Sequence, residues 1–281
     1  MVEKIVITVL VENTIAVPGL TAEKGLSLLI EDGRLRILFD TGKSGAFLAN
    51  AQKLGIDLQH LTHIVFSHGH YDHTGGIICL MDYLKENNSG TFPVLVAHPD
   101  VFEERGIYTK LFHKMLRVRD LGAPIRKKQA MELFPCEFHR HPFWIHEDLV
   151  FLGSVCRTEK KDKPRVFGSI MRLGSPVKDE ILDDSALVYR TEKGLVIIVG
   201  CAHSGICNIV EYAKQITGST QVHAVIGGLH LQHANSRDID AVAGYFKNEA
   251  IPFVHSCHCT GNASERLPHQ VPTMTGSVLT F

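Results

Sequence analysis

Ser67-His68-Gly69-His70-Tyr71-Asp72-His73-Thr74-Gly75-Gly76 is the most informative segment of this sequence. The apolar, β-branched run at residues 61–66 before it predicts a buried strand, and the amphipathic segment at 77–85 after it predicts a helix. The segment therefore belongs on a strand-to-helix turn, and its glycines give the backbone the freedom that such a turn needs. Four potential metal ligands lie within six residues of this turn: His68, His70, Asp72 and His73.

These four residues suit a metal site better than a solvated loop. A turn of alternating ligands can direct several side chains towards one point, and neutral imidazoles with a carboxylate suit zinc or iron. Solvated surface histidines are the alternative, but chance seldom spaces four such side chains so tightly. We therefore predict that the site binds one or two divalent metal ions. Zn²⁺ is the preferred candidate, and Fe or Mn also bind to His and Asp ligands.

The pattern His68-x-His70-x-Asp72-His73 resembles the signature of the metallo-β-lactamase-fold superfamily. Further motifs resemble its ribofuranosylaminobenzene 5′-phosphate synthase-like (dihydropterin synthase-like) branch: Gly25–Ile30, Leu38–Gly42, Asp183–Leu187, Gly200–Gly205, Gly227–His230 and His258–Gly261. The resemblance spans about residues 2–100 and 148–262. It implies an α/β fold, a four-layer αββα sandwich of the metallo-β-lactamase type, whose two sheets bring their strand-end loops to one edge.

The apolar runs and turn signals predict elements in both halves of this sandwich. Strands are expected at 2–11, 25–30, 34–39, 61–66, 93–99, 186–190, 194–199, 222–226 and 252–255, and helices at 44–55, 77–85, 207–217 and 238–249. We expect residues 1–281 to form a single domain. The segment at about 100–147 changes character, with helix-like amphipathic stretches at 101–104 and 111–116, and is predicted to be a helical insertion that forms a lid or pocket wall. A helical excursion packed on the sheet edge is the alternative.

Composition excludes several classes of function. The chain has 281 residues, a formal net charge of −1 and 44% hydrophobic residues, so it shows no charge excess for nucleic acid or an anionic membrane. The charged segment at 157–165 lacks aromatic residues and is predicted to be a mobile surface loop. No apolar run reaches a membrane span, the first residues lack a secretory pattern, and the seven scattered cysteines favour a reducing compartment. We therefore expect a cytoplasmic protein with a small-molecule substrate, and its oligomeric state stays open.

Two histidines in the second half are further ligand candidates. His203 follows a fully apolar strand and precedes a helix, and His258 follows the last clear strand, where the superfamily places its last histidine ligand. Cys257 and Cys259 flank His258 and allow a rival thiolate site. Since alternating residues of an extended segment point opposite ways, we expect both cysteines to face away from the metal.

Four positions depart from the superfamily pattern or stay open. Many members carry a metal-bridging Asp where this chain has Cys201, so a fully occupied two-metal centre is in question; Asp184 or His203 could substitute. Asp40 either contacts a metal-bound histidine or caps the next helix. His98 either faces the site or simply ends a strand, and His230 is predicted to face the substrate or act as an acid or base.

The leading functional hypothesis is a metal-dependent hydrolase that uses metal-activated water on a small phosphoester, lactone or related substrate. Asp72 would orient that water or take its proton. The resemblance implies an alternative, phosphoribosyl transfer of the synthase type, for which Arg157, Arg165 and Arg172 are the nearest basic residues. Iron-dependent redox or sulfur chemistry is a third possibility within the superfamily.

Overall fold

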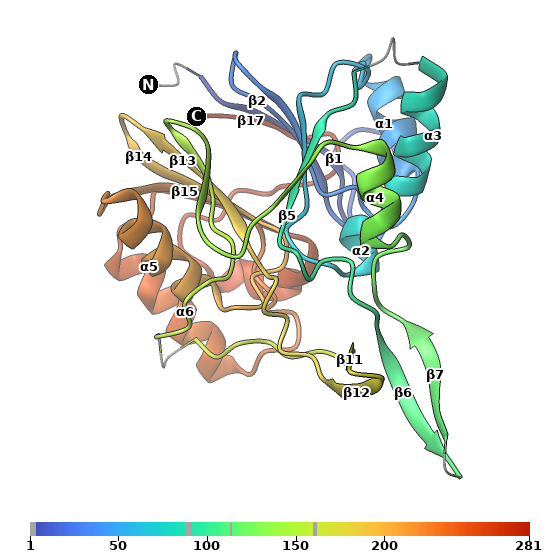
Figure 1. Ribbon diagram of the computed structural model, residues 1–281. Helices are drawn as coiled ribbons and strands as arrows, with labels where there is room; N and C mark the ends of the chain where they lie inside the picture. Colours follow the sequence, from blue (N-terminus) through green and yellow to red (C-terminus); the bar gives the residue numbers. More distant parts are fainter. Residues whose placement is uncertain (1–3, 88–90, 113, 160–161) are drawn as a thin grey trace.

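The computed structural model describes residues 4–87, 91–112, 114–159 and 162–281. It contains two large sheets that face each other, with helices on both outer faces (Figure 1). The first sheet has the strand order β17-β1-β2-β3-β4-β5-β8. Its strands are β1 (Val6–Val11), β2 (Ser27–Glu31), β3 (Arg36–Phe39), β4 (His63–Val65), β5 (Val94–Ala97), β8 (Cys136–Phe138) and β17 (Val278–Thr280). Residues 2–3 of the predicted first strand lie outside the described residues.

The second sheet has the order β16-β15-β14-β13-β10-β9. Its strands β14, β15 and β16 run parallel, so the loops that follow them lie at one edge of the sheet. The strands are β9 (Phe143–His146), β10 (Leu149–Phe151), β13 (Ala186–Thr191), β14 (Gly194–Val199), β15 (Val222–Gly228) and β16 (Phe253–Cys257).

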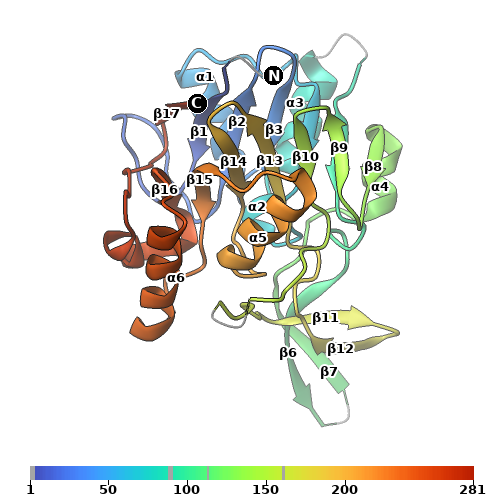
Figure 2. The ribbon, with the colours of Figure 1, turned by 90° about the vertical axis from the view of Figure 1, so that its left-hand side faces the viewer.

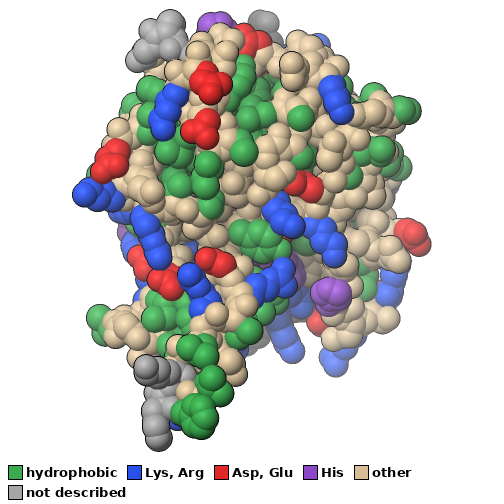
Figure 3. Space-filling model, turned by 90° about the vertical axis from the view of Figure 1, so that its right-hand side faces the viewer, with side chains coloured by type: hydrophobic (Ala, Val, Ile, Leu, Met, Phe, Trp, Pro, Cys, Tyr) green, Lys and Arg blue, Asp and Glu red, His purple; other side chains and the backbone are tan. Residues whose placement is uncertain are grey.

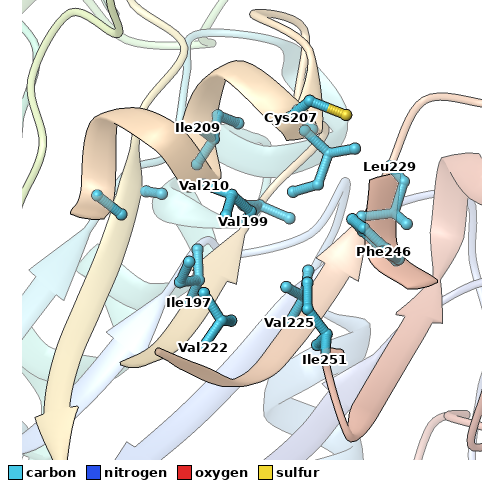
Figure 4. Packing of buried hydrophobic residues seen from close by; sticks show 14 of the residues in the cluster. Ile197, Val199, Cys207, Ile209, Val210, Val222, Val225, Leu229, Phe246 and Ile251 are labelled. Carbon is cyan, nitrogen blue, oxygen red and sulfur yellow. The ribbon is translucent and has the colours of Figure 1, made fainter. Parts of the chain in front are cut away.

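Alternating apolar residues place a core between each pair of layers. Along β14, Val196 and Ile198 face the first sheet, whereas Ile197 and Val199 face the helices α5 (Ile206–Thr217) and α6 (Ser236–Asn248). Figure 4 shows this outer core, in which Phe246 and Val210 pack over the sheet. Helices α1 (Ala46–Lys53), α3 (Ile77–Asn87) and α4 (Lys127–Leu133) cover the other outer face in the same way. These layers confirm the predicted αββα sandwich.

The insertion differs from the helical one that we expected. Residues 100–147 contain a long hairpin, β6 (Arg105–Leu111) and β7 (Lys114–Asp120), which projects from the molecule (Figure 2) and joins β11 (Ser169–Arg172) and β12 (Ser175–Lys178) in a third sheet. After the hairpin come α4 and then the strands β8 and β9. Among the described residues of this segment, α4 is the only α-helix. The segment 111–116 is amphipathic in either conformation, but the run Ile107-Tyr108-Thr109 before it favours a strand. His113, part of that segment, lies outside the described residues.

The described part of the charged segment 157–165 is an irregular surface loop, as predicted, but several contacts anchor it to the protein. Asp162 is buried, and its Oδ2 accepts a hydrogen bond from the Cys207 backbone N–H at 2.8 Å, in the first turn of α5. Arg157 donates to the carbonyls of Glu180 and Ile181, both at 2.8 Å. These contacts hold the described part of the segment against the protein; Lys160 and Lys161 lie outside the described residues.

Candidate metal centre

The predicted ligands meet at the edge where strands of both sheets end. The short loop after β4 carries His68 and His70 and leads into the single-turn helix α2 (Tyr71–Thr74), which carries Asp72 and His73. His203 lies in the loop between β14 and α5. His258 begins the 3₁₀ helix η1 (His258–Arg266) directly after β16. The structure therefore brings all six predicted metal ligands into one region.

Within this region, His68, His70 and His203 form a first ligand group. Their candidate ligand atoms all lie within 4.8 Å of one another, and all three side chains are buried. The Nε2 atom of His68 lies 3.0 Å from Nδ1 of His70. Nitrogen ligands of a tetrahedral Zn²⁺ lie about 3.3 Å apart, given Zn–N distances of about 2.0–2.1 Å.

The hydrogen bonds around the first group leave one ring nitrogen of His68 and one of His203 without a proton. Ser67 Oγ donates to Asp40 Oδ2 at 2.6 Å, so it accepts from His68 Nδ1 at 2.9 Å and leaves His68 Nε2 bare. His203 Nδ1 donates to the carbonyl of Arg165 at 3.0 Å. His203 Nε2 is then a buried acceptor, and it has no hydrogen-bond partner among the described residues. Bare nitrogens that face each other in a buried site fit a cation.

Asp72, His73 and His258 form a second ligand group beside the first. The Nε2 atoms of His73 and His258 lie 3.2 Å apart, and Asp72 Oδ2 lies 3.8 Å from the latter. Each outer ring nitrogen has an acceptor: Asp40 Oδ2 lies 2.7 Å from His73 Nδ1, and Asn13 Oδ1 lies 3.0 Å from His258 Nδ1. These acceptors turn both Nε2 atoms towards the shared space, as second-sphere partners of metal-binding histidines do.

The electrostatics of the two groups agree with this arrangement. Burial lowers the pKa of His68 and His203 well below the usual value. Burial also lowers the pKa of His70 to about 4 and the pKa of His258 to about 3. These four rings are therefore neutral bases at neutral pH. For His73, burial is outweighed by the carboxylates of Asp40 and Asp72, which raise its pKa to about 9. A bound cation would therefore replace a proton at His73.

The thiols of Cys201 and Cys259 also lie in this region, and the position of Cys259 differs from our prediction. Cys201 Sγ lies 3.2 Å from His73 Nε2, between the two ligand groups. Cys257 packs into the core between the sheets, as predicted, but Cys259 Sγ lies with Cys201 and His258. The prediction that both cysteines face away is wrong for Cys259 because His258 has φ 51, which ends the extended backbone.

The positions that the sequence left open are now placed. Asp40 contacts His73 and Ser67 and does not cap α1, whose N-cap is Gly45. His98 bonds to Ser154 Oγ at 2.9 Å and belongs to neither ligand group. Asp184 also stands outside both groups; its Oδ2 accepts from the Ser204 N–H at 2.7 Å and thereby holds the loop of His203.

Sequence reasoning did not find the buried ion pairs that support the first loop. The Gly69 N–H donates to Asp183 Oδ2 at 2.8 Å, and Asp183 Oδ1 accepts from Arg105 Nη2 at 2.6 Å. A Cβ at position 69 would lie 2.1 Å from Arg105 Nη1 and 2.2 Å from the carbonyl oxygen of Val101. Gly69 therefore permits close packing between the loop and the base of the hairpin.

A cavity of about 270 Å³ opens over both ligand groups. Asp72, His203, His258 and the two thiols Cys201 and Cys259 line its inner part. His230, predicted to face the substrate, also lines it, and its ring centroid lies 4.3 Å from that of His203. Lys24, Tyr71, Arg119, Leu121 and Phe167 are among the other residues of the wall. The cavity gives a small molecule access to the candidate ligands.

Comparisons with known proteins agree with this fold and site. A sequence profile of the metallo-β-lactamase superfamily matches residues 20–85. An uncharacterized protein of Methanocaldococcus jannaschii is 32% identical over 262 residues, 91% of this chain and 90% of that protein. The 7,8-dihydropterin-6-methyl-4-(beta-D-ribofuranosyl)-aminobenzene-5'-phosphate synthase of the same organism is 32% identical over 258 residues, 88% of this chain and 84% of that enzyme. A solved structure of a metal-dependent hydrolase of the β-lactamase superfamily is 29% identical, with a TM-score of 0.79 and 98% of both chains covered.

The four-layer αββα fold carries two groups of side chains that could hold metal ions beside a cavity, an arrangement typical of a metal-dependent enzyme. The chain belongs to the metallo-β-lactamase superfamily, in the branch that includes the ribofuranosylaminobenzene 5′-phosphate synthase. This confirms the resemblance drawn from the sequence motifs. Among the described residues, no helix is both long and apolar enough to cross a membrane.

Proposed function

We propose that the protein is a metal-dependent hydrolase of a small ester-type substrate, such as a phosphoester or lactone. The observation that carries this proposal is a set of buried ring nitrogens that face one another: the bare Nε2 atoms of His68 and His203 in the first group, and the Nε2 atoms of His73 and His258 in the second, where a cation would replace the proton of His73. Zn²⁺ fits these donors best, and Fe or Mn are alternatives that elemental analysis of the purified protein distinguishes.

Divalent ions bound here would supply a nucleophilic water of lowered pKa and positive charge for the developing oxyanion. The chain's own contribution begins with Asp72. Burial raises the pKa of its carboxyl, but the histidines His73, His258 and His70 outweigh burial and lower it. Asp72 is therefore a carboxylate at neutral pH, and it can hold an ion of the second group or accept a proton through one of its oxygens.

His230 is the candidate proton donor to the leaving group. Burial lowers the pKa of its ring, so the ring is neutral at rest. It would therefore accept the proton that the attacking water loses and pass that proton to the leaving group. It lines the cavity but belongs to neither ligand group, so its ring remains available to the substrate. A neutral imidazole at the cavity wall suits acid–base exchange with a leaving group.

The test is an assay of the metal-loaded protein against a phosphodiester, a phosphomonoester and a lactone. Asp72→Asn should lower the rate for the accepted substrate by about 10²–10⁴-fold while metal content falls less. Asp82→Asn is the control, because Asp82 is an exposed carboxylate on α3 outside the cavity. Full turnover and full metal content in Asp72→Asn would remove Asp72 from the mechanism.

The synthase activity of the M. jannaschii relative is the second candidate. The match over 88% of the chain favours it, because that enzyme's name includes a 5'-phosphate group and the cavity wall carries Lys24 and Arg119. Incubation with an activated 6-methyl-7,8-dihydropterin and a ribofuranosylaminobenzene 5′-phosphate, the two parts of the product in that enzyme's name, followed by mass spectrometry, decides between the two. Formation of the joined product without hydrolysis of simple esters would favour the synthase.

A further inference from the structure

Two basic side chains, Arg119 and Lys43, lie near the ring of Tyr71 in the cavity wall, and Lys24 lines the same cavity. Arg119 Nη2 donates to the Tyr71 hydroxyl at 2.9 Å, and its guanidinium carbon lies 5.7 Å from the ring centroid. Lys43 Nζ lies 6.0 Å from the same centroid, and Lys24 lines the cavity beside Tyr71. In Figure 3, Lys and Arg side chains gather in the middle of one face of the molecule, with a histidine beside them.

The charge of Arg119 is not neutralised by the protein. Residues 100–147 contain five arginines, and the other four all pair with carboxylates: Arg105, Arg117, Arg126 and Arg140. Within the described ranges, no carboxylate forms an ion pair with the side-chain cation of Arg119, Lys24 or Lys43; Glu23 accepts a hydrogen bond from the backbone N–H of Lys43 at 2.9 Å. Basic groups left unpaired around a cavity attract an anionic ligand.

We propose that Arg119, Lys24 and Tyr71 form a subsite for a phosphate group on the substrate, separate from the bond that reacts. The proposal rests on the proposed function only in placing the reacting bond at the two ligand groups of the same cavity. Two side-chain cations, with Lys43 nearby, match the charge of a phosphate dianion better than that of a carboxylate. The planar guanidinium also offers paired N–H groups to two phosphate oxygens.

Tyr71 is oriented for the same role. Because its hydroxyl oxygen accepts from Arg119, its own proton is free to donate to an anion. Tyr71 directly precedes Asp72, so the subsite adjoins the second ligand group. Phe167 and Leu121 supply apolar surface in the same cavity for the body of the substrate. The hairpin β6–β7 thus contributes a residue that selects the substrate, namely Arg119 near the end of β7.

Binding of three matched aromatic probes to the metal-loaded protein tests this subsite. The probes are phenylphosphonate, benzoate and benzyl alcohol, measured by isothermal titration calorimetry at mildly alkaline pH, where the phosphonate is a dianion. Arg119→Gln should weaken phenylphosphonate binding by about 10- to 100-fold, because a hydrogen bond to a charged group is worth about 1.5–3 kcal/mol. Benzoate should lose less, and benzyl alcohol should be unaffected.

Arg117→Gln is the matched control, because Arg117 lies two residues away on β7 but pairs with Glu104 at 3.0 Å. It should bind all three probes like the parent protein. Equal phosphonate affinity in Arg119→Gln and the parent would show that the metal ions alone hold the anion and would overturn the proposal. A larger loss for benzoate than for phenylphosphonate would overturn it in favour of a carboxylate subsite. Since no turnover is measured, these outcomes do not depend on whether the protein is a hydrolase.

Discussion

At the scale of single residues, the thiols give the second ligand group a chemistry that histidine and aspartate alone would not. Cys201 Sγ approaches His73 Nε2 to 3.2 Å, and the Sγ of Cys259 lies within 4.8 Å of Cys201 and His258 ligand atoms. Zn–S bonds are about 2.3 Å long, so a thiolate fits between ligands with this spacing. Softer thiolate ligands favour zinc and iron over magnesium or calcium.

Cys201→Ser should therefore lower the retention of metal at the second group, and Cys257→Ser should not. Cys257 is the matched control, because it is a buried thiol two residues from Cys259 that packs into the core between the sheets. Metal content by plasma emission spectroscopy and the near-ultraviolet thiolate absorption of the cobalt-substituted protein provide two readouts. If Cys201→Ser keeps both the metal and the absorption, Cys201 is only a small buried neighbour of the site.

The residues of the site show where sequence reasoning succeeds and where it stops. His68, His70, Asp72 and His73 could be predicted because a local turn positions them, and their spacing carries the information. The place of Cys259 could not, because it depends on the positive φ of His258, which an alternating pattern does not reveal. The unprotonated nitrogens follow from partners distant in sequence, such as Asn13 for His258.

At the scale of elements, buried ion pairs fasten the base of the hairpin to the loop before β13. The Arg105 side chain is 1% exposed and contacts Asp179 Oδ2 at 2.8 Å and Asp183 Oδ1 at 2.6 Å. Its Nη1 also donates to the carbonyls of Asp100 and Val101. Because Asp183 in turn accepts from the Gly69 N–H, this network links the hairpin to the metal loop.

Arg105→Met should destabilise the protein by about 3–5 kcal/mol, because it leaves two buried carboxylates without their cation. Arg117→Met removes an ion pair whose arginine is 38% exposed, and it should cost about 0–1 kcal/mol. Urea unfolding followed by circular dichroism measures both. Equal losses for the two variants would show that the buried network contributes no more than a surface pair.

The bounds of helices and strands could be predicted wherever apolar residues recur along the sequence with one clear spacing. β14 and α5, for example, lie within a residue of the predicted bounds. The hairpin was not predictable in the same way, since its strands bury little apolar surface: Leu111 is 52% exposed and Val118 66%. Without a buried face, neither a helical nor a strand period is enforced, and pairing between β6 and β7 decides the conformation.

At the scale of the whole molecule, a polar contact joins the two sheets at the end opposite to the site. Asp32, in the turn between β2 and β3, accepts from the Tyr189 hydroxyl of β13 at 3.0 Å, and His146 Nε2 of β9 lies 3.1 Å from the same oxygen. The layered fold could be expected from the motifs, but this link could not, because its three residues are scattered over more than half of the chain.

This link predicts a pH-dependent contribution to stability. Burial raises the pKa of Asp32, but hydrogen bonds from the Leu35 and Arg34 backbone N–H groups, His146 and Tyr189 outweigh burial and lower it below 3.8. A carboxyl whose pKa is lower in the folded state stabilises that state fully above its unfolded value. The contribution is then lost as the pH falls from about 3.8 through the lower folded value.

Asp32→Asn should therefore be less stable than the parent protein at neutral pH, and the difference between the two should shrink below about pH 3.8. Urea midpoints measured across the acid range at equal metal content give this difference directly. Asp120→Asn is the control, because Asp120 is an exposed carboxylate at the end of the hairpin and should show a small difference throughout. A difference for Asp32→Asn that stays constant down to low pH would mean that the side chain stabilises the sheets by its shape and hydrogen bonds and not by its charge.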